Sequence, residues 1–315
     1  MKYPWKTDRR FNSYTAFIQE KFGTRVQKLS LNAGFTCPNR DGTVGVGGCI
    51  FCNNDAFSPS YVGGNKAISR QIIEGIEFHA KRYKTDKFFA HFQTYSNTYA
   101  PIEKLKAAYE EALSFDNVLG LVISTRPDCV DDEKLDYLVE LAKKHYIMIE
   151  YGVESCFDKT LKIINRGHNF ESAKRAIEIT HEKGIPVGVH IIFGLPGETY
   201  EDMYNMVDIL NKLPIDNIKF HQLQIVKETK LELLFQIYPK QLAAFPTYDS
   251  YVSFLILALE HLNPNIKIQR VAGEVRANTI VYPHWGNLRY DQMLNILEKE
   301  MARRDTWQGK LYHDS

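Results

Sequence analysis

Hydrophobic and polar residues follow two alternating patterns over the first two thirds of the chain. Short runs of β-branched, aromatic and largely apolar residues are typical of parallel strands that are covered by helices. We expect six such strands, at residues 26–31, 87–93, 118–124, 146–152, 186–193 and 217–224. Helical patterns separate them, for example at 131–145, where apolar residues recur at i, i+3, i+4 and i+7, and at 170–183, which stops at Gly184.

Six β–α units in a row predict a parallel sheet with right-handed crossovers. A complete TIM barrel has eight units, so we predict an α/β fold with a partial (β/α)6 TIM-like barrel. The last part of the chain has two helical patterns, at 248–262 and 290–303, around a strand-like run at 266–271. We therefore expect three parts: an N-terminal extension (1–25), a core (26–225) and a small C-terminal α/β extension packed on the core (226–315).

The composition is that of an ordinary globular protein, with 315 residues, 44% hydrophobic and 24% charged. No apolar run reaches the ~18–20 residues of a membrane span. The N-terminus is basic and lacks the apolar segment of a secretory signal, so we expect a cytoplasmic location without membrane association. The net charge of +1 says nothing about nucleic acid, because binding depends on how charge is distributed.

Three of the five cysteines fall within 16 residues, on the loop after the first predicted strand. Clustered thiols in a cytosolic chain of this size ligate metal more often than they form disulfides. The loop is rich in glycine, which allows the backbone to wrap closely around a bulky inorganic group. Three thiolates suit three irons of a [4Fe–4S] cluster and leave the fourth iron open. The expected metal ligands are Cys37, Cys49 and Cys52.

Structural zinc is the alternative for this loop. Zinc in such sites takes four protein ligands, and the next candidate along the chain is His79. The remaining cysteines, Cys129 and Cys156, are expected to be small buried residues. His168, His190 and His221 are candidates for acid–base groups, but a lone histidine on a strand is more often a buried residue of the core.

The Cys-x-aromatic-Cys motif after the first strand of a six-fold β/α repeat resembles the radical-SAM superfamily. The loop that precedes it is long, as in the catalytic subunit of Elongator, a tRNA-modifying complex. Further segments resemble the same branch in chain order, at residues 124–129, 149–155, 165–168, 189–199 and 286–289. The resemblance covers about residues 28–290. The chain is therefore similar to the short bacterial Elongator-like branch (the YhcC/YtqA type) that lacks an acetyltransferase domain.

This resemblance implies two cofactors, a [4Fe–4S] cluster and S-adenosyl-L-methionine (SAM), and an electron donor such as flavodoxin or ferredoxin. The resemblance does not identify a catalytic residue. Many family members carry Gly-Gly-Glu after the second strand to hold the amino group of SAM, whereas here Gln93 and its neighbours stand there. The residues that the resemblance places near SAM are Phe51, Gln93, Ser124, Arg126, Glu150, Arg166, Ile192 and Gly194.

Several of these residues also have a plain structural interpretation. The ring of Phe51 suits adenine but also an ordinary core. Arg126 can pair with a carboxylate of SAM or with Asp128. Arg166 is a candidate for the methionyl carboxylate or a solvated arginine at a helix end. Glu150 lies on an apolar strand that seldom buries a carboxylate without a partner, which favours a functional role. Gly194 begins a turn between a strand and a helix.

Three classes of function are compatible with the sequence. The resemblance to Elongator implies radical modification of tRNA at carbon 5 of the wobble uridine. Since the chain has no acetyltransferase part, we expect it to act on a side chain that already exists. The first alternative is radical chemistry on a small molecule such as a tetrapyrrole or metabolite. The second is a non-enzymatic metal protein that binds RNA.

Overall fold

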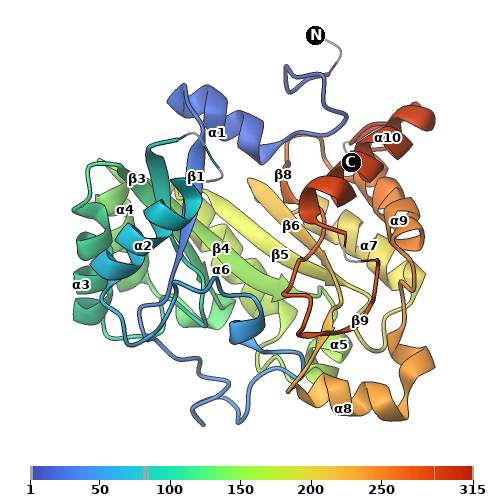
Figure 1. Ribbon diagram of the computed structural model, residues 1–315, viewed down its shortest axis with the longest axis horizontal. Coiled ribbons are helices and arrows are strands. Elements are labelled where there is room, and N and C mark those ends of the chain that lie inside the picture. The colour runs from blue at the N-terminus through green and yellow to red at the C-terminus, as the bar shows by residue number, and fades with distance from the viewer. Residues whose placement is uncertain (1–2, 81–82, 84, 287, 314–315) are drawn as a thin grey trace.

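The computed structural model describes residues 3–80, 83, 85–286 and 288–313 (Figure 1). One sheet of parallel strands curls into an open half-barrel, in the order β1-β2-β3-β4-β5-β6-β8. The six expected strands are confirmed, and each begins within one residue of its predicted start. Their bounds are β1 Val26–Leu31, β2 Lys87–Phe92, β3 Val118–Thr125, β4 Tyr146–Glu154, β5 Val187–Phe193 and β6 Asn217–Gln222.

The C-terminal extension supplies a seventh strand to this sheet. β8 (Lys267–Arg270) lies parallel to β6, with a register shift between Ile218 and Lys219 of β6. An isolated bridge between Ser13 and Ile268 ties the N-terminal segment to the same edge. A separate antiparallel pair, β7 (Ile225–Val226) and β9 (Ile280–Tyr282), was not expected from the sequence. The predicted partial TIM-like barrel is thus confirmed, with one strand added.

Helices connect the strands and cover the outer face of the sheet (Figure 1). Side-chain caps mark several starts; Thr199, for example, accepts from the backbone N–H of Asp202 at 3.0 Å. The helices are α1 Tyr14–Phe22, α2 Ile68–Ala80, α3 Ile102–Leu113, α4 Asp132–Ala142, α5 Asp158–Ile163, α6 Phe170–Glu182, α7 Tyr200–Asn211, α8 Lys230–Ile237, α9 Tyr248–His261 and α10 Tyr290–Arg303.

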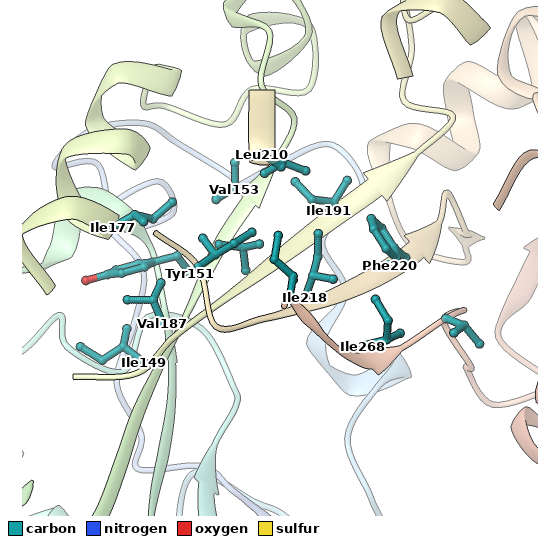
Figure 2. Packing of buried hydrophobic residues seen from close by; sticks show 14 of the residues in the cluster. Ile149, Tyr151, Val153, Ile177, Val187, Ile191, Leu210, Ile218, Phe220 and Ile268 are labelled. Carbon is teal, nitrogen blue, oxygen red and sulfur yellow. The ribbon is translucent and has the colours of Figure 1, made fainter. Parts of the chain in front are cut away.

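The two faces of the sheet differ in chemistry because successive side chains point to opposite sides. On β4, Ile149, Tyr151 and Val153 point into the main hydrophobic core. There they pack with residues of the neighbouring strands and of α6 and α7, such as Ile177 and Leu210 (Figure 2). The residues between them face the inside of the half-barrel. This inner face is largely polar, and it forms the candidate site.

Helix α1 closes the inner face near the amino-terminal ends of the strands. Its residues Tyr14 and Ile18 pack on Phe89, Val122 and Met148, which are the inward apolar side chains of β2, β3 and β4. The interior is therefore left free between α1 and the cysteine loop that follows β1. Among the described residues, no helix is long and apolar enough to cross a membrane.

Candidate functional site

A cavity of about 590 Å³ runs through the half-barrel from the cysteine loop to α1. Every strand of the seven-stranded sheet contributes side chains to its wall. Its volume is within the range of about 300–1,000 Å³ that is usual for small-molecule sites. We call the two regions of this cavity the cysteine end, lined by Cys37, Cys49 and Cys52, and the α1 end, lined by Tyr14, Thr15 and Ile18.

The cysteine loop is shaped by glycines. Gly42, Gly47 and Gly48 have φ values of 96°, 81° and 79°, which disfavour residues with a side chain. Gly45 is required for a different reason, because a Cβ there would lie 2.2 Å from Oδ1 of Asn39. Asn39 is fully buried, and its amide group donates to the carbonyl of Asn165 at 2.5 Å. The loop is thereby fastened to the segment that follows α5.

Several N–H groups point at the cysteine sulfurs. Arg166 Nη1 lies 3.5 Å and Asn39 Nδ2 3.7 Å from Cys49 Sγ, and Arg40 Nη1 lies 3.9 Å from Cys52 Sγ. Burial and the neighbouring sulfur of Cys49 raise the pKa of Cys52 to about 11. Because a bound cation stabilises thiolates and N–H donors tune them, this environment fits cysteines that ligate metal.

The donor set fits an iron–sulfur cluster. Three thiols line one end of one cavity, and positively charged groups lie beside their sulfurs. Within the part of the chain that the structure describes, no three His, Cys, Asp or Glu side chains are close enough to hold a single metal ion. The thiolates of a cluster bind different irons, so they do not need to converge on one point. Cluster binding by these cysteines stays a prediction.

Arg166 and Glu154 form a charged pair beside the sulfurs. Arg166 Nη2 lies 3.5 Å from Glu154 Oε1 and donates to the carbonyl of Gly152 at 2.5 Å. Gly152 makes room for this pair, since a Cβ would come within 2.6 Å of both side chains. Burial raises the pKa of Glu154, although Arg166 opposes this shift. The predicted site residue Arg166 thus lies at the cysteine end.

Glu154 was missed as a site residue by the sequence reasoning. It is the last residue of β4, and it adopts a φ of 67° that is uncommon for glutamate. A signal was present in the sequence, because Glu154 follows Glu150 and Gly152 at a spacing of two. Side chains at that spacing share one face of a strand. All three residues line the cavity.

The other predicted SAM-binding residues fall into two groups. Phe51, Gln93, Ser124 and Ile192 line the cavity, and Gln93 accepts a hydrogen bond from Ser30 Oγ at 2.9 Å. Gly194 is not among the described residues of the wall. Its φ is 87°, and a Cβ would lie 2.9 Å from Cβ of Ala244, so its backbone faces the C-terminal extension.

Arg126 lines the cavity but is held by protein groups. It is 2% exposed, and its guanidinium makes two bonds to the carboxylate of Asp128, at 2.9 and 2.7 Å. A third bond, of 2.6 Å, runs to the carbonyl of Arg166. The structure therefore contains the internal ion pair that the sequence left open as an alternative. This pair also fixes the backbone that carries Arg166.

Glu150 is fully buried at the centre of a polar network inside the half-barrel. Each of the other six strands of the sheet contributes one side chain that contacts its carboxylate. These side chains are Lys28, His91, Ser124, His190, Lys219 and Gln269.

Both oxygens of Glu150 are occupied. Lys28 Nζ and Gln269 Nε2 donate to Oε1 at 2.7 and 2.5 Å, while Ser124 Oγ donates to Oε2 at 3.1 Å. Lys219 Nζ also donates to Oε2. Burial alone would raise the pKa of Glu150, but Lys219 and Lys28 hold it well below its usual range. The carboxylate is thus ionised and organises the inner wall; its predicted contact with SAM remains a prediction.

The two strand histidines are not core residues, contrary to expectation. His190 and His221 line the cavity with stacked rings whose centroids are 6.0 Å apart. Burial lowers the pKa of His190 to about 4, so its ring is neutral near pH 7.

Cys129 and Cys156 are buried, as expected, and neither is among the described residues of the cavity wall. Of the segment 286–289, which resembles the Elongator branch in sequence, Asn287 lies outside the described residues.

Family models and curated proteins show what the chain is similar to. Residues 36–210 match the family model of the radical SAM superfamily, and residues 215–303 match the model of the Radical_SAM C-terminal domain. An uncharacterised protein of Methanocaldococcus jannaschii is 38% identical over 95% of this chain and 91% of its own length. YtqA of Bacillus subtilis, also uncharacterised, is 33% identical over 97% of this chain and 94% of its own length.

Similarity to tRNA-modifying proteins is more distant. A tRNA uridine(34) acetyltransferase of Dehalococcoides mccartyi is 27% identical over 57% of this chain and 38% of its own length. Among solved structures, the archaeal Elp3 of Methanocaldococcus infernus superimposes with a TM-score of 0.67 at 17% identity. That match covers 90% of this chain and 64% of the archaeal chain, and at this identity it shows a shared fold.

Proposed function

Because the chain belongs to the radical SAM superfamily, we propose that it binds a [4Fe–4S] cluster through Cys37, Cys49 and Cys52 and cleaves SAM. When bound, the cluster and SAM would supply a one-electron cleavage that yields a 5′-deoxyadenosyl radical. The observation that carries this proposal is the cysteine end of the cavity, where three thiols line one mouth of the half-barrel and N–H donors point at two of the sulfurs.

The chain itself would bind and orient the cofactors and the substrate and would exclude water, because the cofactors supply the chemistry. Arg166 and Glu154 carry opposite charges beside the thiols and match the carboxylate and ammonium groups of an amino acid. Phe51 offers a flat apolar face to the cavity. The curled sheet and α1 enclose the cavity, and this enclosure would keep solvent and unintended hydrogen atoms away from the reacting groups.

For the substrate, we propose a C5 side chain that already exists on the wobble uridine of tRNA. Support comes from the similarity to tRNA uridine(34) acetyltransferases, of which the Dehalococcoides protein matches this chain over 38% of its own length. The proposed reaction therefore includes a radical step but no acetyl transfer. Bases in single-stranded RNA loops can be splayed into a pocket, and aromatic side chains such as Tyr95 and Phe57 line this cavity.

The cofactor proposal predicts that Cys49→Ala loses iron and sulfide. After anaerobic reconstitution, the wild type should hold about four irons and form 5′-deoxyadenosine with dithionite and SAM. The variant should hold substantially less iron and form no 5′-deoxyadenosine. Cys156→Ala is the matched control, because that cysteine is buried away from the cavity wall and should keep both signals. Equal iron content in Cys49→Ala and the wild type would contradict the assignment.

The substrate proposal predicts a change in the nucleosides of total tRNA. A strain without the gene should accumulate a precursor of a C5-modified uridine and lose the product, as measured by liquid chromatography and mass spectrometry. Restoring the wild-type gene should restore the product, whereas restoring Cys49→Ala should not. Identical profiles in all strains would rule out this substrate and favour a small molecule instead.

A further inference from the structure

Positive charge gathers at the α1 end of the cavity. Lys28, Lys219 and Arg270 line the wall there, and the ammonium group of Lys28 lies 5.3 Å from the ring centre of Tyr14 on α1. Glu150 is the buried carboxylate among them, and the two lysines share it. Glu274 also lines the cavity but is exposed to solvent. Lys28 and Lys219 thus share one buried carboxylate, and Arg270 adds a further cation to the same wall. Arg25 also lines the cavity, with its guanidinium 4.2 Å from the ring centre of Tyr83.

Arg270 reaches the cavity because of an irregularity in strand pairing. Ile218 pairs with Ile268, but Lys219 pairs with Arg270, so Gln269 is an extra residue between two pairs. Such a bulge re-aims side chains and places neighbours on the same face. Gln269 and Arg270 consequently both line the cavity, although they are consecutive. The irregularity adds a guanidinium to a wall that already holds two ammonium groups.

Within the described part of the chain, Arg270 has no anionic partner of its own. None of the described carboxylates lies within 4.0 Å of its guanidinium, and no described group accepts a hydrogen bond from it; the ring of Tyr290 lies 5.9 Å away. Beside it, Nε2 of His221 is buried without a hydrogen-bond partner among the described residues. A partly buried charge and a buried polar atom that lack partners are costly, and the guanidinium of Arg270, which can only donate, points to a ligand that supplies acceptors.

We propose that the α1 end of the cavity is a subsite for an anionic group of the substrate, a carboxylate or a phosphate, which Arg270, Lys219 and Lys28 bind. This inference deepens the proposed function and rests on it for the identity of the bound molecule as substrate. SAM would be held at the opposite, cysteine end. The anionic group at the α1 end therefore anchors the substrate and sets which of its hydrogen atoms faces the SAM site.

The electrostatics of Lys219 agree with this assignment. Burial lowers the pKa of Lys219 to about 7, and the positive charges of Lys28 and Arg270 add to this shift. An oxyanion between these groups would offset their mutual repulsion. A guanidinium can in addition bind two oxygens of a carboxylate or phosphate at once, which a lysine cannot do.

The test is anion-dependent thermal unfolding of the cluster-containing protein, with sodium acetate, sodium phosphate and sodium chloride at equal ionic strength. At about ten times the dissociation constant, acetate or phosphate should raise the unfolding midpoint by about 1–3 °C above chloride. Arg270→Gln should lose this difference, and Arg270→Met is a second neutral variant. Arg303→Gln, on the exposed face of α10, is the matched control and should keep it.

The outcomes separate the two proposals. A larger effect of acetate indicates a carboxylate on the substrate, and a larger effect of phosphate indicates a phosphate group. Equal anion effects in the wild type and in both Arg270 variants would overturn the proposed subsite. An anion that binds at the cluster or elsewhere would not depend on Arg270. The measurement needs no cleavage of SAM, so an anion effect in a protein that forms no 5′-deoxyadenosine would contradict only the proposed function.

Discussion

At the scale of single residues, Glu198 shows how burial without full pairing makes a carboxyl sensitive to pH. Ser155 Oγ donates to its Oε1 at 2.5 Å, whereas Oε2 is buried and has no partner among the described residues. Burial raises the pKa of Glu198 to about 7. The protonated form is therefore the favoured one in the folded protein below about pH 7.

Glu198→Gln should stabilise the protein at high pH. The folded pKa of this group is raised, so its contribution to stability is present below the unfolded pKa and is lost as the pH rises through about 7. We expect the variant to gain about 1–2 kcal/mol over the wild type between pH 5 and pH 8. Urea unfolding at both values measures this gain. Glu201→Gln, at an exposed position, should show none, and a pH-independent difference for Glu198→Gln would contradict the prediction.

At the scale of elements, the period of two in each strand separates a hydrophobic outer layer from a polar inner wall. Glu150 and Lys219 each lie between two outward apolar residues, and Lys28 directly precedes the outward Leu29. The same alternation explains why the strands look apolar in sequence and nevertheless carry the site. The contact between β3 and β4 depends on one glycine, since a Cβ on Gly120 would lie 1.9 Å from the carbonyl oxygen of Tyr146.

Gly120→Ala should therefore destabilise the sheet strongly. A methyl group at this point meets backbone, which cannot rotate away as a flexible side chain could. We expect a loss of about 3 kcal/mol or more in the free energy of unfolding. Gly63→Ala is the control, because the nearest atoms to its Cβ would be side-chain atoms of Lys66 at 3.8 Å or more. Similar unfolding midpoints for both variants would refute the argument.

At the scale of the whole molecule, segments from both ends of the sequence are joined beside β8. Gln308 is 1% exposed, and its Oε1 accepts from the backbone N–H of Asn12 at 2.9 Å. Its Nε2 donates to the carbonyls of Asn263 and Ile266 at 2.9 and 2.8 Å. Figure 1 shows the N-terminal segment running beside the C-terminal helix at this edge of the sheet. One side chain thus connects both ends of the chain with the start of the seventh strand.

Gln308→Ala should lower the stability of the whole protein. It leaves one partly buried N–H and two carbonyl groups without their partner, and each such loss costs about 1 kcal/mol or more. We expect about 2–4 kcal/mol in total, measured by urea unfolding. The exposed Gln241 is the control, and its replacement by alanine should change stability by less than about 0.5 kcal/mol. An unchanged midpoint for Gln308→Ala would show that the ends are not held by this residue.

The amino-acid sequence by itself determined the local features of the protein. Strand positions follow from apolar runs and helix starts from caps such as Thr199, because both depend on neighbours in the chain. The cysteine motif is local for the same reason, so its spacing alone is enough to predict Cys37, Cys49 and Cys52 as metal ligands.

Only the tertiary structure decided how distant segments meet. The fastening of Asn39 to Asn165 joins residues 126 positions apart, and the network around Glu150 draws one side chain from each strand. Arg270 faces the cavity because β8 joins β6 with an irregular register, which no pattern within β8 encodes. Periodicity specifies which side of a strand is apolar, but pairing between strands depends on long-range packing, and it is pairing that assembled the site.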